Sequence, residues 1–120
     1  MKRPIVGVIS NSYLVDDSYP VQLAGTSNLE ALYDVSKVFP VIFPGIPELC
    51  DTNEICENFD GILLTGARPN IHPEEYGEEE TPEHGQFDLN RDAVSLPLVR
   101  ACVEKEIPIL GICRGFQEFN

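Results

Sequence analysis

The sequence is poor in basic residues. It has 8 Lys and Arg against 20 Asp and Glu, which gives a formal net charge of −12 over 120 residues. Nucleic acids and anionic membrane surfaces are bound through clustered basic side chains, so neither is expected as a partner. We interpret the excess of acidic residues as a feature that keeps the protein soluble.

Long apolar runs are also lacking. No stretch approaches the roughly 20 residues of a membrane-spanning helix. The apolar run at residues 5–9 follows a short basic N-terminus, but it is too short for a secretory signal and no small-residue cleavage site follows it. We therefore expect a cytoplasmic protein.

Four cysteines occur, at positions 50, 56, 102 and 113, and no two of them have a zinc-type Cys-x2-Cys spacing. In a reducing compartment free thiols are the default. The irregular spacing disfavours a metal site built from Cys50, Cys56, His72 and His84. No metal or other cofactor is expected.

Short apolar runs alternate with segments of helical periodicity. Strands are predicted at residues 5–9, 40–44, 62–64 and 107–112. Helices are predicted at residues 29–37, 48–58 and 91–106, with another beginning at 115. The strands are continuously apolar, which is typical of strands buried on both faces. The alternation predicts an α/β fold, a flavodoxin-like parallel sheet with helices on both faces, cut after its last strand and turn.

Finer signals mark the ends of these elements. Ser27 to Glu30 form a capping box for the first helix, and an earlier start near Val21 is the alternative. Residues 11–20 are polar and rich in turn formers, so a loop is predicted there. Residues 66–90 form a second, longer loop, and loops of this length are usually functional or mobile. Pro97 either lies in the first turns of a helix that starts near Ala93 or kinks that helix.

Cys113 lies where a nucleophile would be expected. It directly follows a predicted buried strand and precedes a predicted helix, with Gly111 and Gly115 two residues away on either side. A strand, a sharp turn and a helix form a nucleophile elbow, in which small flanking residues relieve crowding. The free N–H groups of the helix would lower the thiol pKa, and the N–H of Arg114 would face an oxyanion. The competing interpretation is a buried packing cysteine.

Gly66 ends the third predicted strand, and ligands of such sheets bind at the carboxyl ends of the strands. Without a side chain, its N–H could reach a bound carbonyl. A plain turn glycine explains it equally well. The remaining cysteines, at positions 50, 56 and 102, lack glycine flanks and are interpreted as packing residues.

Three segments resemble the class I glutamine amidotransferase-like hydrolases, and most of all the gamma-glutamyl-gamma-aminobutyrate hydrolase family of polyamine breakdown. They are residues 64–77, which include Thr65-Gly66 and end in Pro-x-x-Tyr-Gly, residues 88–92 with their acidic-x-x-Arg-Asp pattern, and residues 107–120 with Ile-Cys-Arg-Gly-Phe-Gln-Glu. The resemblance implies a cysteine hydrolase that opens gamma-glutamyl amides through a thioester. It implies Cys113 as nucleophile, Gly66 and Arg114 as backbone oxyanion donors, and Gln117 beside the gamma-glutamyl group.

The chain also departs from the family pattern. Thr65 stands where the family usually has Pro, and Lys37-Val38 where it usually has a Gly-Gly pair. The family's catalytic His and Glu belong to a C-terminal half, and neither His72 nor His84 matches them. Residues 1–120 are therefore predicted to be the N-terminal part of one such domain, with the C-terminal half absent, and to be inactive alone. An uncovered sheet would then leave the fragment marginally stable or self-associating.

Other residues of the motifs have two interpretations. Arg91 and Asp92 orient the long loop or a substrate carboxylate, or else Asp92 simply complements the helix dipole. The acidic cluster between Glu74 and Glu83 is interpreted as a solvated loop.

Two other functions stay open. One is the glutaminase subunit of an amidotransferase, which would deliver ammonia to a partner. The other is a redox-sensing cysteine protein of similar fold. Such proteins pair the thiol with a carboxylate from the first strand, and residues 5–9 contain none. The expected partner is a small gamma-glutamyl substrate, and the sequence leaves a homodimer open.

Overall fold

The structure is a computed structural model, and it describes residues 2–66, 88–112, 115 and 118. Its centre is a sheet of four parallel strands in the order β4-β1-β5-β6. These strands are β1 (Ile5–Ile9), β4 (Phe39–Phe43), β5 (Gly61–Leu64) and β6 (Ile109–Gly111). All four coincide with predicted strands, so the predicted parallel sheet is confirmed.

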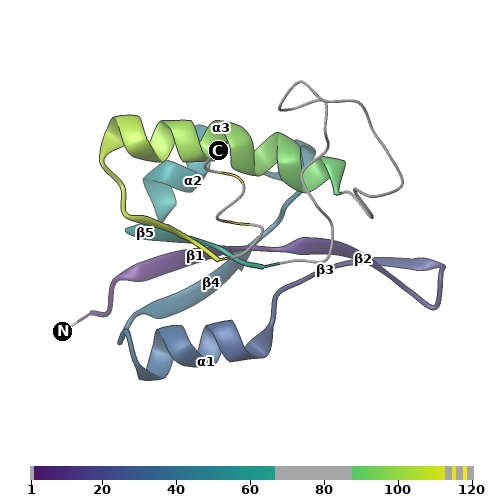
Figure 1. Cartoon of the computed structure of the whole chain (residues 1–120), viewed down its shortest axis with the longest axis horizontal. Helices are drawn as coiled ribbons and strands as arrows, with labels where there is room; N and C mark the ends of the chain where they lie inside the picture. Colours follow the sequence, from purple (N-terminus) through teal and green to yellow (C-terminus); the bar gives the residue numbers. More distant parts are fainter. Residues whose placement is uncertain (1, 67–87, 113–114, 116–117, 119–120) are drawn as a thin grey trace.

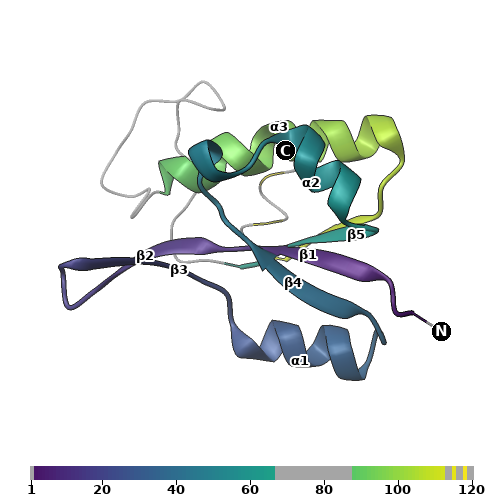
Figure 2. The same ribbon diagram turned by 180° about the vertical axis from the view of Figure 1, so that it is seen from behind.

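Helices cover both faces of the sheet, as predicted for a flavodoxin-like fold. Helix α1 (Thr26–Asp34) lies on one face, and α2 (Thr52–Asn58) and α3 (Leu89–Lys105) lie together on the other (Figures 1 and 2). A short 3-10 helix, η1 (Pro47–Leu49), precedes α2. The chain runs from β1 to the edge strand β4 and then returns past β1 to β5. The direction of winding thus reverses between β1 and β5, which is where sheets of this class bind ligands.

The hydrophobic core lies between the sheet and the pair α2 and α3. All four residues of β5 are buried, because this strand has neighbours on both sides and helices above it. Val94, Leu98 and Cys102 recur every four residues along α3 and point into this core. The helical periodicity predicted for residues 91–106 is therefore confirmed.

Helix α3 begins earlier than the sequence pattern suggests. Asp88 is its N-cap residue, and its side chain accepts a hydrogen bond from the N–H of Arg91. Pro97 is consequently well inside the helix, which continues to Lys105. The expected start near Ala93, with Pro97 in the first turns, is wrong, because Asp88 caps the helix one turn before Ala93.

The predicted loop at residues 11–20 is wrong. Strands β2 (Asn11–Val15) and β3 (Tyr19–Leu23) form an antiparallel hairpin there, and Asp16 and Asp17 in its turn both have positive φ. Only Ser10 separates β1 from β2, so the hairpin projects from the carboxyl end of β1 (Figure 1). Most of its side chains are exposed, so no buried apolar run marked it in the sequence.

The predicted capping box is also wrong. Helix α1 begins at Thr26, with Gly25 as N-cap residue and no side-chain cap hydrogen bond. Ser27 therefore lies inside the first turn, where it cannot act as the cap. The helix itself is confirmed, although it ends at Asp34 and not at Lys37, whose φ of 60° is left-handed.

None of the helices in the described part of the chain has both the length and the apolar character needed to cross a bilayer.

Candidate active site

The carboxyl ends of β5 and β6 lie side by side. Leu64 is paired in register with Gly111, and the N–H of Ile112 donates to the carbonyl oxygen of Leu64 at 2.9 Å. Thr65 and Gly66 follow β5 directly, while residue 113 follows Ile112. The structure thus brings Gly66 and the end of β6 to the same edge of the sheet. Three of the predicted site residues, Cys113, Arg114 and Gln117, lie outside the described residues.

Gly115 occupies a position with no room for a side chain. It is helical, and its N–H donates to the carbonyl oxygen of Ile112 at 2.9 Å. A Cβ atom on Gly115 would lie 2.1 Å from the carbonyl oxygen of Leu64, which is far inside van der Waals contact. The crowding expected two residues after the candidate nucleophile is confirmed, and it comes from the neighbouring strand β5.

Gly66 is half-buried and follows Thr65, which is fully buried. It lies two residues beyond Leu64, the last residue of β5, so its predicted position at the end of this strand is confirmed. The peptide bond between these two residues is trans, since the described residues include no cis peptide.

The acidic-x-x-Arg-Asp motif forms the first turn of α3. The two carboxylate oxygens of Asp88 accept hydrogen bonds from two segments, one from the N–H of Arg91 and one from the N–H of Ser12, each at 3.0 Å. Asp92 lies in the first turn and is buried. An acidic residue there complements the helix dipole, as the sequence analysis suggested. The motif also attaches the β2–β3 hairpin to α3.

Arg91 has the most extensive contacts at this edge of the sheet. Its side chain is fully buried, and it forms an ion pair with Glu118 in which its Nη2 atom lies 2.8 Å from Oε1. The same Nη2 donates to the carbonyl oxygen of Thr65 at 2.6 Å, while Nη1 donates to Oδ1 of Asn11. These contacts leave Arg91 engaged with the protein's own segments, which argues against the predicted contact with a substrate carboxylate.

A second polar group joins β1 to the loop after β4. The hydroxyl of Ser10, fully buried, accepts a hydrogen bond from the N–H of Gly45 and donates to Oε1 of Gln22, both at 2.8 Å. These contacts fix the point where the hairpin leaves the sheet, next to Asn11 and the Arg91 contacts.

Sequence reasoning missed the roles of Ser10, Asn11 and Glu118. Glu118 follows Gly115 by three residues, and this spacing puts both on one face of a helix. That spacing was the available signal for a buried Glu118, because Gly115 must face β5. Asn11 was assigned to a loop and Ser10 to no element, so nothing distinguished them.

The other described cysteines fit packing roles. Cys102 is fully buried, and burial together with the neighbouring Cys56 raises the pKa of its thiol to about 12. Burial also raises the pKa of the Cys50 thiol, as do the nearby Glu54 and Asp51. Both thiols therefore stay protonated near neutral pH and make poor nucleophiles. No group of three or more His, Cys, Asp and Glu side chains suited to a metal occurs among the residues that the structure describes.

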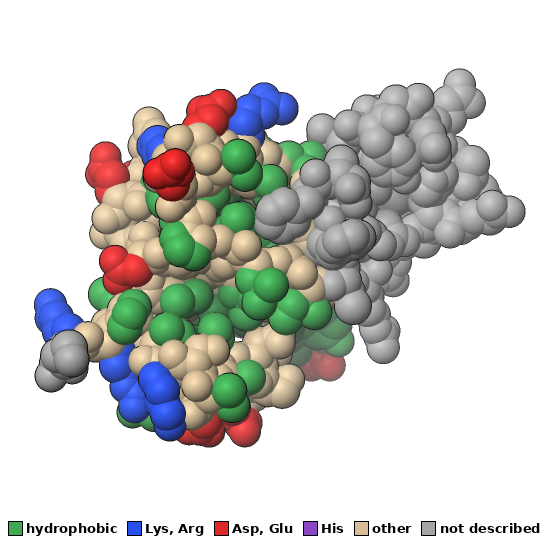
Figure 3. Space-filling view, turned by 60° about the vertical axis from the view of Figure 1, so that its left-hand side comes forward, with side chains coloured by type: hydrophobic (Ala, Val, Ile, Leu, Met, Phe, Trp, Pro, Cys, Tyr) green, Lys and Arg blue, Asp and Glu red, His purple; other side chains and the backbone are tan. Residues whose placement is uncertain are grey.

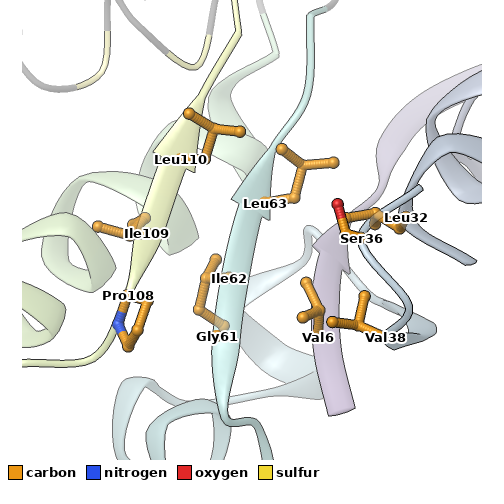
Figure 4. A pocket seen from close by; sticks show the side chains of 10 residues that line it. All are labelled: Val6, Leu32, Ser36, Val38, Gly61, Ile62, Leu63, Pro108, Ile109 and Leu110. Atoms are coloured by element: carbon orange, nitrogen blue, oxygen red, sulfur yellow. The ribbon is translucent and has the colours of Figure 1, made fainter. Parts of the chain in front are cut away.

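An apolar groove lies away from this edge, between α1 and the strands β1, β5 and β6 (Figure 4). Leu63 and Leu110 are register partners on neighbouring strands and contribute side chains to it. Hydrophobic side chains gather across the middle of the described face in the space-filling view (Figure 3). Among the described residues that line the groove, Ser36 contributes the one hydroxyl and no side chain is ionisable, so these residues supply no acid–base chemistry.

Comparison with known proteins identifies the family of the chain. Residues 4–120 match the model of the Peptidase C26 family. The chain belongs to this family. Peptidase C26 domains are class I glutamine amidotransferase-like, so the predicted family and its hydrolase-type enzyme class are confirmed.

Relatives of this Peptidase C26 chain carry two kinds of name. The gamma-glutamyl-gamma-aminobutyrate hydrolase of Escherichia coli O157:H7 is 30% identical over 119 residues, and that of strain K12 is 29% identical over 119 residues. Each match covers 98% of this chain and 45% of the relative. A "putative glutamine amidotransferase" of Schizosaccharomyces pombe is 41% identical over 81 residues, which are 67% of this chain and 30% of the relative. The chain thus spans less than half the length of these relatives.

Proposed function

We propose that residues 1–120 carry the nucleophile and oxyanion part of a cysteine hydrolase that cleaves gamma-glutamyl amide bonds, of the gamma-glutamyl-gamma-aminobutyrate type found in polyamine breakdown. The observation that carries the proposal is the close approach of Gly115 to the carbonyl oxygen of Leu64. A nucleophile elbow has this crowding two residues after its nucleophile, where only a small residue fits. Membership of the Peptidase C26 family supports the same reaction class.

In the proposed reaction the Cys113 thiolate attacks the gamma-carbonyl carbon of the substrate, and a carbon–sulfur bond forms. The N–H groups of Gly66 and Arg114 stabilise the oxyanion of the tetrahedral intermediate. Collapse of this intermediate breaks the carbon–nitrogen bond, and the amine leaves with a proton. Water then attacks the thioester, which releases glutamate and regenerates the thiol. Gln117 contacts the gamma-glutamyl group.

The elbow helix would activate Cys113, because N–H groups at a helix N-terminus stabilise a thiolate. A general base is still needed for full activity. We propose that a His and a Glu outside residues 1–120 supply it, since this chain spans 45% of its gamma-glutamyl hydrolase relatives. On this proposal residues 1–120 turn over no gamma-glutamyl substrate alone.

The test uses the full-length gene product that contains residues 1–120. It is incubated with a glutamine analogue that carries a diazomethyl ketone in place of the amide, and the adduct is located by peptide mass spectrometry. We expect a single adduct at Cys113, formed more slowly when gamma-glutamyl-gamma-aminobutyrate is added as a competitor. Cys102 serves as an internal control, because its raised pKa keeps it protonated.

Cys113→Ser is the matched variant, and it should lose both the adduct and the hydrolysis of gamma-glutamyl amides. A Cys113 that reacts with hydrogen peroxide but with neither the analogue nor gamma-glutamyl amides would contradict the proposal and favour a redox-sensing role.

A glutaminase subunit is the second candidate, because the S. pombe relative at 41% identity is named as an amidotransferase. The two candidates differ in the leaving group. A hydrolase of the proposed type cleaves secondary gamma-glutamyl amides, whereas a glutaminase prefers glutamine and releases ammonia. Comparing kcat/KM for gamma-glutamyl-gamma-aminobutyrate and for glutamine distinguishes them.

A further inference from the structure

Arg91 joins three segments that are far apart in the chain. It reaches Asn11 after β1, Thr65 after β5 and Glu118 in the helix after β6, while Asp88 caps the helix turn that carries it. We call Arg91, Asn11, Thr65 and Glu118 the Arg91 cluster. The guanidinium and the carboxylate of Glu118 are both fully excluded from solvent.

A buried ion pair is a weak source of stability. Removing two charges from water is costly, and packed apolar side chains of similar volume often serve stability as well or better. What a guanidinium supplies instead is geometry, because its donors are fixed in one plane and point in set directions. The Arg91 cluster therefore has a structure suited to holding its partners in defined positions.

The contact with Thr65 bears on the proposed oxyanion site. The carbonyl oxygen of Thr65 and the N–H of Gly66 belong to one peptide group, which is planar and trans. In such a group the C=O and the N–H point in opposite directions. Arg91 Nη2 donates to that oxygen from the buried side, and the N···O distance is 2.6 Å. This contact therefore fixes the direction in which the Gly66 N–H points. A charged donor on the oxygen also polarises the peptide and strengthens the N–H as a donor.

The contact with Glu118 bears on the other proposed donor. Glu118 and Gly115 are three residues apart in the helix that begins after β6, and both are buried. Arg91 Nε donates to Glu118 Oε1 at 2.9 Å, so the guanidinium holds this helix as well. One side chain thus holds both the peptide of Gly66 and the segment of Gly115 and Glu118, which follows the other proposed donor in the chain.

We propose that Arg91 is a positioning residue for the oxyanion site, which sets the Gly66 N–H and the elbow helix in mutual register through Thr65 and Glu118. This inference rests on the proposed function. Arg91 acts through these partners and does not contact the substrate. Its loss should therefore lower kcat and leave KM nearly unchanged, because the oxyanion exists only in the transition state.

The test is the double variant Arg91→Met, Glu118→Leu in the full-length gene product. Replacing both partners avoids leaving a buried charge unpaired, so the double variant should be more stable than either single variant. We expect kcat for a gamma-glutamyl amide to fall roughly 100-fold, the scale seen when an oxyanion donor is lost or displaced, while KM changes by less than about threefold. Alkylation of Cys113 by iodoacetamide needs the thiolate but no oxyanion site, so its rate should fall much less than kcat.

A second readout is independent of turnover. The amide resonance of Gly66 should shift and its hydrogen exchange should accelerate in the double variant. Arg100→Met is the matched control, because Arg100 lies on the same helix and is exposed. It should leave kcat and the Gly66 resonance unchanged.

Arg91→Lys provides a second variant if the double variant does not fold. Lysine keeps the charge beside Glu118 but lacks the planar fork, so kcat should still fall at least about tenfold in a folded protein. A folded double variant, or a folded Arg91→Lys variant, with wild-type kcat and an unshifted Gly66 amide would overturn the positioning role. If the wild-type protein itself does not hydrolyse gamma-glutamyl amides, the proposed function fails, and the Gly66 resonance alone decides whether Arg91 sets this peptide.

Discussion

A Cβ atom on Gly115 would lie 2.1 Å from the carbonyl oxygen of Leu64. The obstacle is backbone at the end of a central strand, so it cannot move aside as a flexible side chain could. The carbonyl oxygen of Leu64 also accepts a hydrogen bond from the N–H of Ile112, and this bond holds the carbonyl in place. The path of the chain from β6 into the following helix therefore depends on a glycine at this position.

Gly115→Ala should consequently displace the helix from β5. We expect a loss of roughly 3 kcal/mol in the free energy of unfolding, at the upper end of overpacking effects, together with loss of Cys113 labelling by the glutamine analogue. Chemical denaturation measures the first. Gly25→Ala is the matched control, because its nearest neighbour would be Asn28 Nδ2 at 3.4 Å. Equal effects of the two substitutions would contradict the assigned crowding.

Asp88 should contribute more to the stability of the fold than an ordinary helix cap does. Asp88→Ala removes the cap of α3 and the bond to the Ser12 N–H, so we expect a loss of about 2 kcal/mol, at the upper end of capping effects. Asp51→Ala removes only the cap of α2, where Asp51 accepts from the Glu54 N–H, and should cost about 1 kcal/mol. Hydrogen exchange at Ser12 should accelerate in the Asp88 variant alone. Unchanged exchange at Ser12 would show that the hairpin is held by other contacts.

The raised pKa of Cys102 predicts a loss of stability in alkali. An ordinary thiol has a pKa of 9.0, and that of Cys102 is raised to about 12 in the fold. Below pH 9 both the folded and the unfolded chain keep the proton. Between pH 9 and 12 the unfolded chain releases it first, so the free energy of unfolding should fall as the pH rises through this window. Cys102→Ala should show a shallower fall over the same range in pH-dependent denaturation, and identical slopes would refute the assignment.

The open side of the sheet predicts self-association of residues 1–120. β6 is at the edge of the described sheet, and Leu110 on it is 61% exposed beside an apolar groove. We expect a second copy of the chain to cover this surface, which sedimentation velocity would detect as a concentration-dependent shift. Leu110→Glu should weaken the association. Leu89→Glu, equally exposed on the opposite helix layer, should not. Equal sedimentation of both variants and the parent at all concentrations would rule out this surface.

Much of the fold follows from local sequence patterns. The four strands of the sheet are short runs buried on both faces, and burial on both faces leaves a continuously apolar signature. Helix α3 was recognisable from the spacing of Val94, Leu98 and Cys102. The hairpin was not, because Tyr13 and Tyr19 on it are exposed and Pro20 lies within β3.

The candidate site was only partly predictable for a different reason. Gly66 and Gly115 are marked by their position relative to the strands, which a sequence pattern can show. The partners of Arg91 cannot be recognised in this way, because they depend on which strands become neighbours in the sheet. Arg91 belongs to a recognisable motif, yet nothing near it in sequence indicates that its charge is balanced by Glu118, 27 residues later.

The distances in sequence between these partners also bear on how the protein assembles. The contact between Asn11 and Arg91 joins residues 80 positions apart. Closing so long a loop is entropically unfavourable until other contacts have shortened it, and non-local contacts of this kind slow folding. The pairing of β1 with β4 and β5 supplies such shortening, so the Arg91 cluster should be among the last parts of the molecule to form. On the ribosome it cannot be completed before Glu118 has emerged, so a growing chain would pair β1 with β4 and β5 well before the geometry proposed for catalysis is complete.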